Sequence, residues 1–530
     1  MKYAVTGNEM KKYDRNTSEY FGIPTFTLME RASLQVADVI ENWVRMRSSG
    51  RQYKALIFAG VGNNGGDGVC TARLLKQRGF LVEVCVVGDY TKCSDLLLEQ
   101  LKILEKYGTG TVTFSNIRDN KSNSQWDIIV DALFGIGLSR PVTGDYKEAI
   151  DYINRCKEER REDLFVISVD VPSGINADTG EVCQAAVKAD ATVTFNQTKL
   201  GHILYPGCEY CGELLVRDAG ITCDSFLGNE PHAFFYDEKI DELLPQRKRD
   251  ANKGTNGKLL VIAGSDEISG ACVLCAKAAF YTGCGMVKVF TSSQNAEAVK
   301  TLLPEAMLET YDAGEKIGDK LRDALKWSTS AVIGPGIGMS FRAGEMLGLV
   351  LEEYDKNLLI DADALNLISE SESLRKLAQN YPREGRKLIL TPHLGEFARL
   401  YGLSVSECKK NILDYPVNLA KEFHCTVICK DARTIVTDSG EKKIYINVSG
   451  NDGMATAGSG DVLAGIIGAL FACGLSSFET ACIGTYLHGL SGDRAASKVG
   501  KHSMTASDII SGLRDVLFES LDTVYEPGCE

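Results

Sequence analysis

The first third of the chain alternates short apolar runs with segments whose apolar residues recur at helical spacing. The run YKALIFAG (53–60) ends at a glycine, and the segment DGVCTARLLKQRG (67–79) that follows it has helical spacing. The same rhythm continues, with strand-like runs at 80–88, 126–137, 164–174, 190–196 and 212–221 and an amphipathic segment at 95–108. Strands and helices in alternation predict a parallel sheet covered by helices.

A second series of the same kind begins near residue 257. Its apolar runs occupy 257–265, 331–338, 357–368, 387–400 and 425–438, and a small-residue helical pattern follows at 450–470. The stretch 222–257 between the two series is polar and charged, with Pro, Asn and Gly toward its end. We therefore predict an α/β protein of two domains, 1–221 and 240–530, joined by a linker at 222–239. The series are not obvious copies of each other, which favours fusion over duplication.

Composition adds several exclusions to this picture. A chain of 530 residues is too long for one hydrophobic core, which agrees with two domains. Its net charge of −13 argues against nucleic acid or an anionic membrane as a partner, because no broad cationic face is available. No run reaches about 18 apolar residues, so no transmembrane helix is expected, and the polar N-terminus lacks the core of a signal peptide.

These features predict a cytoplasmic protein whose 17 cysteines are reduced thiols rather than disulfides or zinc ligands. Two C-x-x-C pairs exist, and the one formed by Cys272 and Cys275 lies in ACVLCAKAAF. That segment predicts a buried helix, in which both thiols serve as small apolar residues.

The segment GVGNNGGDG (60–68) is the first candidate for chemistry. It follows a predicted strand and precedes a predicted helix, where unpaired N–H groups and the helix dipole favour an anion. In an open parallel sheet, ligands collect at the carboxyl ends of strands. The spacing is neither the G-x-G-x-x-G dinucleotide fingerprint nor a P-loop, and a simple helix N-cap after a tight turn is the alternative.

Two acidic residues end other predicted strands of this series. Asp131 lies in VDALFGIG and Asp170 in SVDVPSG, with Ser173 three residues after Asp170. A carboxylate at such a position is costly unless it is paired, hydrated or bound to a cation. Each could be a turn cap on its own. Three polar strand ends at one edge of a sheet predict a binding crevice instead.

The segments GNNGGDG, VDALFGIG and VDVPSGINADTG, with GIPTFTLMERA (22–32), resemble the N-terminal epimerase module of the bifunctional NAD(P)H-hydrate repair enzymes. The resemblance covers about residues 1–220. It implies a Rossmann-like three-layer αβα sandwich that interconverts the R and S forms of NADH and NADPH hydrated at C6, and that binds potassium. Ser33 stands where the family usually has glycine, which concerns helix packing more than chemistry.

The resemblance also implies roles for individual residues. Asp170 would contact the reacting end of the hydrate, where a carboxylate could move a proton at the C6 hydroxyl. Asn64, Asp131 and Ser173 would be oxygen ligands of the potassium ion. The hydrate would be cradled by Asn63, Asn64, Gly65, Gly66, Asp67, Gly135, Ile136, Gly137, Leu138, Ser139, Arg140 and Pro141.

The second candidate is the run GNDGMATAGSGDVLAGIIGAL (450–470), which ends in a small and apolar helical pattern. The segment Gly458–Asp461 (G-S-G-D) lies where that helix should begin, and successive backbone amides there form an anion pocket. Asp461 is placed to take a proton from a substrate hydroxyl as phosphate is transferred to it. The alternative is an aspartate that only stabilises the helix start.

G-S-G-D in a doubly wound domain resembles the ribokinase-like fold. The segments KGTNGKLLVIAGS, GPGIG, DADALNL, TPHLGE and NDGMATAGSGD narrow the resemblance to the C-terminal dehydratase module of the same repair enzymes, over about residues 240–520. This implies phosphorylation of the C6 hydroxyl of the S hydrate by ADP, then elimination driven by the ring nitrogen, which releases AMP and phosphate. ADP would be a co-substrate, accompanied by magnesium.

By this resemblance Asp461 is the general base. Substrate contacts would come from Ala271, Gly338, His393, Glu396 and Asp461. The adenine nucleotide would be held by Lys430, Asp431, Ala432, Arg433, Thr434, Asn451, Asp452, Gly453, Met454, Ala455, Thr456, Ala457, Gly458, Ser459 and Gly460. Asp431 replaces a common glycine of the family, which puts close approach of the ADP phosphates at this point in question.

Two other hypotheses stay open at this stage. The chain could be a ribokinase-like small-molecule kinase fused to a nucleotide-sensing domain, or its first half could bind an NAD(H) derivative without catalysis. The residues do not decide ADP against ATP or NADH hydrate against NADPH hydrate. Relatives of both modules assemble, so we expect a homo-oligomer.

Overall fold

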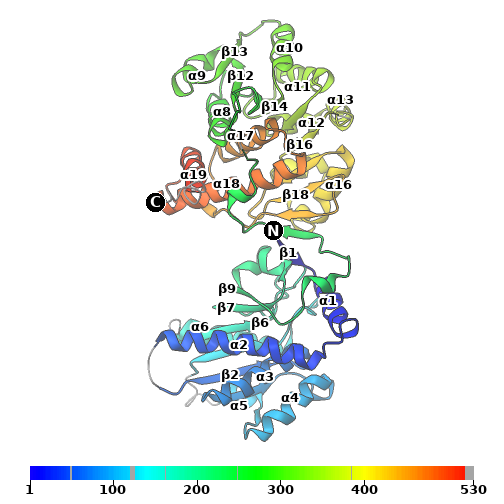
Figure 1. Cartoon of the computed structure of the whole chain (residues 1–530), viewed down its shortest axis with the longest axis vertical. Coiled ribbons are helices and arrows are strands. Elements are labelled where there is room, and N and C mark those ends of the chain that lie inside the picture. The colour runs from blue at the N-terminus through cyan, green and yellow to red at the C-terminus, as the bar shows by residue number, and fades with distance from the viewer. Residues whose placement is uncertain (48–50, 120–125, 161–162, 247–248, 384, 520–530) are drawn as a thin grey trace. The chain divides into compact units, whose positions relative to one another are not determined.

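The computed structural model describes residues 1–47, 51–119, 126–160, 163–246, 249–383 and 385–519. The chain divides into two compact units, Lys2–His232 and Ala233–Glu530. In Figure 1 the first runs from blue to green and the second from green to red. Within the polar stretch 222–239, Cys223–Phe226 is a 3₁₀ helix and Ala233–Phe235 a short strand.

The N-terminal unit is built on a seven-stranded sheet with the order β4-β3-β2-β5-β6-β7-β9, in which every pair is parallel. Its strands are β2 (Lys54–Ala59), β3 (Leu81–Val86), β4 (Thr111–Val112), β5 (Ile128–Ala132), β6 (Phe165–Val169), β7 (Ala191–Phe195) and β9 (Glu213–Arg217), with a separate pair β1 (Lys2–Val5) and β8 (Thr198–Lys199). Its helices are α1 (Gly7–Glu19), α2 (Thr25–Arg47), α3 (Asn63–Gln77), α4 (Asp95–Lys106), α5 (Phe114–Asp119), α6 (Gly144–Arg160) and α7 (Leu200–Ile203). The strand order reverses between β2 and β5, which is where such sheets bind ligands.

Alternate residues of β2 enter two different cores. Ile57 packs in a cluster with residues of α2, α3 and α4, whereas Phe58 packs in a second cluster with residues of α5 and α6. Successive side chains of a strand point to opposite faces, so helices cover both faces of this sheet. The unit is therefore a parallel sheet covered by helices, as the alternation predicted, and has the three-layer αβα architecture that the resemblance implied (Figure 1).

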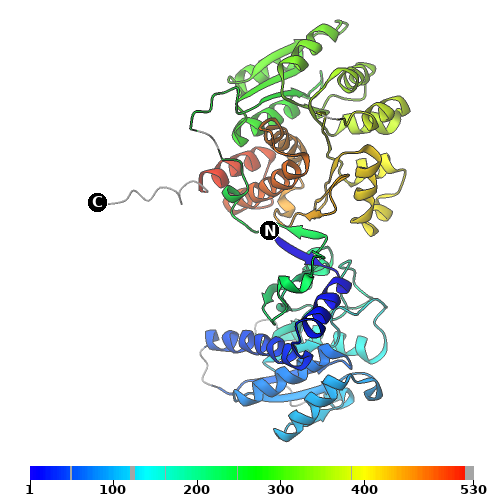
Figure 2. The same cartoon turned by 45° about the vertical axis from the view of Figure 1, so that its right-hand side comes forward.

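The C-terminal unit has the strand order β13-β12-β11-β14-β15-β16-β17-β18-β19-β10. Its strands are β10 (Ala233–Phe235), β11 (Lys258–Ile262), β12 (Met286–Ser292), β13 (Met307–Tyr311), β14 (Ser330–Ile333), β15 (Asn357–Ile360), β16 (Leu388–Leu390), β17 (Thr426–Cys429), β18 (Ile435–Asp438) and β19 (Ile444–Ile446). Its helices are α8 (Gly270–Thr282), α9 (Ala296–Leu302), α10 (Gly318–Trp327), α11 (Phe341–Glu353), α12 (Asp363–Glu370), α13 (Glu372–Gln379), α14 (Leu394–Tyr401), α15 (Val405–Lys410), α16 (Asp414–Phe423), α17 (Ser459–Ala472), α18 (Ser477–Val499) and α19 (Ala506–Glu519). Helices α17 and α18, orange in Figure 2, pack on each other, and α17 also packs against β14.

Two local predictions need correction. The helix predicted over 67–79 begins at Asn63, so most of the glycine-rich segment forms its first turns instead of a preceding loop. The run 425–438 is a hairpin of β17 and β18, and β18 is antiparallel to both neighbours. Apolar periodicity does not report strand direction, and the dense glycines obscured the helix start.

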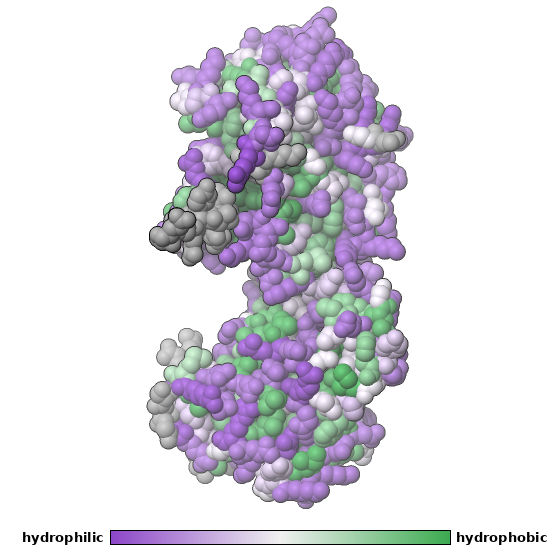
Figure 3. All heavy atoms as spheres, in the orientation of Figure 1, coloured by the Kyte–Doolittle hydropathy of each residue, from purple (hydrophilic) through white to green (hydrophobic). Residues whose placement is uncertain are grey.

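Other local predictions are confirmed. Helix α17 begins at Ser459, and α8 buries Cys272 and Cys275 completely. Within the described part of the chain, no helix has both the length and the apolar character needed to cross a membrane. On the face drawn in Figure 3, hydrophilic residues predominate over the C-terminal unit and hydrophobic residues are interspersed over the N-terminal unit.

Candidate active sites

The first site lies at the carboxyl edge of the N-terminal sheet, where β2 leads into α3. Gly62 is the N-cap residue of α3 and has no side chain to cap it. The N–H groups of the first helical turn are therefore available to an anion, and the helix dipole adds to the attraction. The predicted residues Asn63–Asp67 form this turn.

The glycines of this edge serve two different purposes. A Cβ at Gly65 would overlap the carbonyl oxygen of Gly60, and one at Gly66 would stand 2.6 Å from Met29 Cε. These glycines let α3 pack against β2 and α2. A Cβ at Gly62 or Gly137 would meet nothing within 4 Å, so these two glycines leave space at the crevice.

Asp131, near the end of β5, is completely buried, and within the described part of the chain its hydrogen-bond partners are neutral donors. Ser168 Oγ and Ser173 N each donate a hydrogen bond of 2.8 Å to its Oδ2. Burial raises the pKa of Asp131, and these hydrogen bonds oppose the rise. Ser173 Oγ in turn accepts the N–H of Phe134 at 2.9 Å.

Asn64 lies against Gly135. Its Oδ1 and Asp170 Oδ2 each stand 3.3 Å from the point where a Cβ of Gly135 would be. Asn64 Nδ2 is buried without a hydrogen-bond partner among the described residues. The carboxylate of Asp131, the Ser173 hydroxyl and the Asn64 side-chain oxygen are the kinds of oxygen donor that a hard monovalent cation takes, and the neutral partners of Asp131 leave its negative charge to such an ion.

Asp170 follows β6 and has a left-handed backbone with φ of 65°. Such a conformation is strained for a residue other than glycine and is found at active sites. Lys199 Nζ lies 2.7 Å from its Oδ1, and Thr194 Oγ1 lies 3.1 Å from the same oxygen. Burial alone would raise the pKa of Asp170, but the Lys199 ammonium outweighs it, and the pKa lies below the usual range.

His202 is hydrogen-bonded to the backbone of both Lys199 and Asp170. Its Nδ1 accepts the N–H of Lys199 at 3.1 Å, so its Nε2 carries the proton and donates to the carbonyl oxygen of Asp170 at 2.9 Å. Burial, with the charge of Lys199, lowers the pKa of His202 to about 3, so the imidazole is neutral.

Sequence reasoning missed Lys199, Thr194 and His202. The available signal was a lysine inside the apolar stretch TVTFNQTKLGHIL. Two further acids, Asp67 and Asp14, interact with Asp170: burial, together with the charges of Asp170 and Asp14, raises the pKa of Asp67 well above its usual range. One carboxylate here is held ionised while another holds its proton more tightly.

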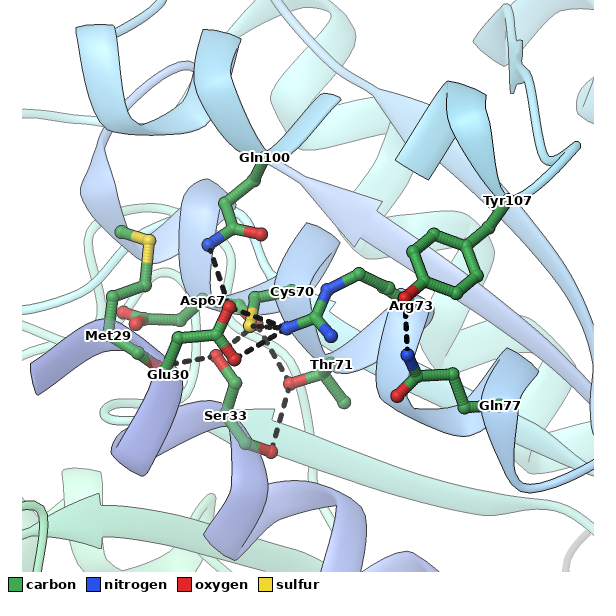
Figure 4. Close-up of polar contacts among 10 residues, drawn as sticks. All are labelled: Met29, Glu30, Ser33, Asp67, Cys70, Thr71, Arg73, Gln77, Gln100 and Tyr107. Atoms are coloured by element: carbon green, nitrogen blue, oxygen red, sulfur yellow. Dashed lines mark hydrogen bonds and ion pairs between the residues drawn. The ribbon is translucent and has the colours of Figure 1, made fainter. Parts of the chain in front are cut away.

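A polar network in Figure 4 holds α3 in place between α2 and α4. Arg73 Nη2 lies 2.6 and 2.5 Å from the two carboxylate oxygens of Glu30, and Gln100 Nε2 donates to Glu30 at 3.5 Å. The hydroxyl of Ser33, fully buried, lies 2.8 Å from the carbonyl oxygen of Met29 and 3.0 Å from that of Asp67, and its proton is shared between these two acceptors. Ser33 thus lies between α2 and α3, and it bonds the backbone of a predicted substrate-binding residue.

The second site lies where α17 begins in the C-terminal unit. Gly458 has φ of 87°, and a Cβ there would meet Leu274 Cδ1 at 2.5 Å. Asp461 lies in the first helical turn. Lys430 Nζ stands 3.5 Å from the position of a Cβ on Gly460, so its ammonium lies beside the G-S-G-D turn.

A second carboxylate, Asp361 after β15, binds this lysine. Lys430 Nζ and Thr391 Oγ1 each lie 2.7 Å from Asp361 Oδ1, and Asp361 is 1% exposed. Burial and the charge of Asp361 raise the pKa of Asp461 to about 6, although Lys430 opposes the rise. Asp363, which also raises it, accepts the N–H of Gly338 at 2.8 Å.

His393 and Glu396 form a capping box at the start of α14. His393 Nδ1 accepts the N–H of Gly395 at 2.9 Å, and Glu396 accepts the N–H of His393 at 2.8 Å. Burial raises the pKa of Glu396 to about 7. Lys430 N donates to the carbonyl oxygen of Pro392 at 2.8 Å, which brings the predicted substrate and nucleotide residues together.

The predicted nucleotide residues Lys430–Thr434 form the turn between β17 and β18, and Asn451–Gly460 lead into α17. Asp431 does not have the positive φ that requires glycine, so its Cβ is compatible with this backbone. Asp493 anchors the second segment by accepting from Gly450 N at 2.8 Å and Asn451 Nδ2 at 2.9 Å.

The remaining predicted substrate residues lie around the start of α8. Ala271 Cβ is 3.0 Å from the position of a Cβ on Gly336, two residues before Gly338. Sequence reasoning assigned no role to Asp361, Asp363 or Asp493. The first two lie in the quoted segment DADALNL, where the pair of acids was the available signal.

Comparison with known proteins follows this division of the chain. A family model described as NAD(P)H-hydrate dehydratase matches residues 259–514, and one described as YjeF-related protein N-terminus matches residues 25–201. A bifunctional NAD(P)H-hydrate repair enzyme of Thermofilum pendens is 34% identical over 526 residues, covering 96% of this chain and 95% of the relative. That of Coxiella burnetii is 37% identical, covering 86% of this chain and 89% of the relative.

A solved structure described as an ADP/ATP-dependent NAD(P)H-hydrate dehydratase of Bacillus subtilis, co-crystallised with ATP and Mg²⁺, is also similar. It is 27% identical, with a TM-score of 0.47, over 53% of this chain and 96% of that one. These two relatives are matched over 95% and 89% of their length, and each is described as bifunctional. The chain belongs to the family of bifunctional NAD(P)H-hydrate repair enzymes.

Proposed function

We propose that the N-terminal unit epimerises the R and S hydrates of NADH and NADPH, and that the C-terminal unit dehydrates the S form with ADP. One observation carries this proposal: each unit has a largely buried carboxylate under the influence of a lysine, Asp170 bonded to Lys199 in the first unit and Asp461 near the Lys430–Asp361 pair in the second. Family membership over nearly the whole chain supports it. We further propose that the protein works in the cytoplasm as a homo-oligomer.

The epimerisation follows from the chemistry of the hydrate. C6 carries a hydroxyl and the ring nitrogen N1, so removal of the hydroxyl proton lets the C6–N1 bond break and a C6 aldehyde form. Asp170, kept ionised by Lys199, accepts this proton, and Asp67, whose pKa is raised, protonates N1. Ring closure on the other face of the aldehyde returns both protons and gives the opposite epimer.

Asn64, Asp131 and Ser173 would hold the potassium ion, which supplies positive charge at the hydrate. The support is the buried carboxylate of Asp131 and its neutral hydrogen-bond partners. After exhaustive dialysis, epimerisation should depend on added potassium, and Asp131→Asn should remove that dependence. Full epimerisation in lithium alone would contradict this site.

In the C-terminal unit, Asp461 would take the proton of the C6 hydroxyl. The hydroxyl oxygen would then attack the β-phosphorus of ADP, and AMP would leave. The Lys430 ammonium, beside the G-S-G-D turn, would stabilise the charge on the transferred phosphoryl group. The lone pair of N1 then expels phosphate from C6, and loss of the C5 proton restores the double bond. Magnesium would be held with the nucleotide.

A single assay tests both halves of the proposal. A mixture of R and S NADH hydrate is incubated with ADP, or with ATP, and nicotinamide absorbance and chiral chromatography are followed together. Complete recovery of NADH is expected with ADP. Recovery that stops at the S fraction, after correction for spontaneous epimerisation, would show that the first unit only binds ligand. No recovery with either nucleotide would favour the kinase hypothesis.

A further inference from the structure

A cavity of about 440 Å³ in the N-terminal unit takes no part in the sites described above. It contains neither the predicted potassium ligands nor Asp170. Its lining residues are Val86, Val87, Gly88, Tyr90, Thr111, Val112, Thr113, Phe114, Ser115, Arg118 and Asp145.

The cavity lies at the carboxyl ends of β3 and β4. In the strand order β4-β3-β2-β5-β6, the cavity lies on one side of β2, while Asp131 near the end of β5 and Asp170 directly after β6 lie on the other side. The reversal of strand order falls between them. Open α/β sheets bind dinucleotides across this reversal, with one nucleotide half on each side.

The cavity is also adjacent to the start of α3. Gly88, which lines it, would place a Cβ 3.2 Å from Val61 Cγ1 and against the hydroxyl of Tyr146. Ser94 N donates to the carbonyl oxygen of Val61 at 2.9 Å, and the Tyr146 hydroxyl is bonded to the backbone of Val61. Val61 immediately precedes Gly62, the N-cap residue of α3, so a residue that lines the cavity is in contact with the residue before the predicted phosphate-binding turn.

The lining suits a purine nucleoside. Val112 and Phe114, two of the lining residues, are partly buried and pack against the core of the unit. Tyr90 adds a half-exposed aromatic side chain, and aromatic side chains stabilise a bound base by stacking. Thr113 and Ser115, bonded to each other at 2.9 Å, offer hydroxyls to a ribose. About 440 Å³ also lies within the size range of small-molecule sites.

We propose that this cavity is the subsite for the adenosine half of the hydrated dinucleotide. The proposal rests on the epimerase function, because it places the reacting ring at Asp170 and the phosphates at the start of α3. The dinucleotide would then extend along the carboxyl edge from β6, past β5 and β2, to β3 and β4. Adjacent strands are about 4.8 Å apart, so this path covers roughly 14 Å from β6 to β3.

The test compares two substrates in the full chain without ADP, so that the C-terminal unit consumes neither. One is R NADH hydrate, and the other is the hydrate of reduced nicotinamide mononucleotide, which lacks adenosine. Ser115→Trp fills the cavity, and Asn116→Trp, on the next exposed residue of α5 and outside the lining, is the matched control. Tyr90→Ala is a second variant that removes an aromatic wall without adding bulk.

Ser115→Trp should lower kcat/KM for the dinucleotide hydrate about tenfold or more and leave that for the mononucleotide hydrate unchanged. Tyr90→Ala should act in the same direction, and Asn116→Trp should change neither substrate. Equal kcat/KM ratios in all three variants and the parent chain would overturn the subsite. Failure of the parent chain to epimerise either substrate would instead overturn the epimerase function.

Discussion

The two units place a lysine beside a carboxylate in different ways. In the N-terminal unit Lys199 is bonded directly to Asp170, and the pKa of Asp170 lies below its usual range. In the C-terminal unit Lys430 is bonded to Asp361 instead, and the pKa of Asp461 rises to about 6. Both carboxylates are largely buried, so the partner of the lysine decides the difference.

This difference matches the proposed chemistries. Reversible proton exchange with the hydrate needs a carboxylate that is ionised before substrate binds, and a directly bonded ammonium provides it. In phosphoryl transfer the cation is more useful near the phosphate, and Asp361 holds Lys430 there while Asp461 remains basic enough to take a proton. A lysine and an aspartate therefore serve different chemistries in the two units, because the C-terminal unit has a second acid, Asp361, that binds the lysine.

The largest expected effect comes from removing either carboxylate. Asp170→Asn should reduce epimerisation about 10²–10⁴-fold and leave dehydration of purified S hydrate unchanged, because a neutral amide cannot accept the proton. Asp461→Asn should do the reverse. Both rates are measured on each variant, with recovery of NADH absorbance and chiral chromatography. Loss of both activities in one folded variant would contradict the independence of the two sites.

Breaking the ion pair between Lys199 and Asp170 should lower the stability of the protein as well as its epimerase activity. Lys199→Met leaves Asp170 buried without its cation and should lower the free energy of unfolding by about 3–5 kcal/mol. Denaturant unfolding measures this, with Lys157→Met as a control, since Lys157 pairs with Asp190 nearer the surface and should cost about 0–1 kcal/mol. The double variant Lys199→Met/Asp170→Asn should regain much of the stability but no epimerisation. No recovery in the double variant would contradict a charge effect.

In the C-terminal unit Lys430 is bonded to Asp361 and not to Asp461, and this arrangement predicts that two substitutions shift the pH dependence of dehydration in opposite directions. The base Asp461 must be ionised, so kcat/KM of dehydration should fall as pH drops below about 6. The charged groups acting on Asp461 are Asp361, Asp363 and Lys430. Asp361→Asn removes a negative charge and should move this acid limb about one pH unit lower, whereas Lys430→Met should move it higher. Shifts of the same sign in both variants would refute this account.

The smallest effect is expected from the contact between α2 and α3. Ser33→Ala removes the hydrogen bond to the Asp67 carbonyl and should cost about 1 kcal/mol of unfolding free energy. Ser33→Gly should cost about 1 kcal/mol more, because glycine weakens a helix interior. Both should leave kcat/KM of epimerisation unchanged. Lost epimerisation at unchanged stability would show that Ser33 acts on the substrate turn itself.

Much of the fold was predictable from local pattern. Apolar runs ending in glycine marked β2, β5 and β6, and the predicted helix-covered parallel sheet followed from their alternation with helices. The start of α3 was misplaced because its first turn contains Gly65 and Gly66, which local propensity assigns to loops. Tertiary packing overrides that propensity: these glycines let the helix approach β2 and α2, which no local pattern reveals.

The sequence by itself determined the family, the two α/β units and the segments that carry their carboxylates, because these are properties of local spacing and residue type. Only the tertiary structure decided which charges meet. Lys199 binds Asp170 across 29 positions of the chain, and Lys430 binds Asp361 across 69 positions. Parallel strands bring such distant residues to one edge, and burial there makes each neighbour's charge set the pKa of the acid.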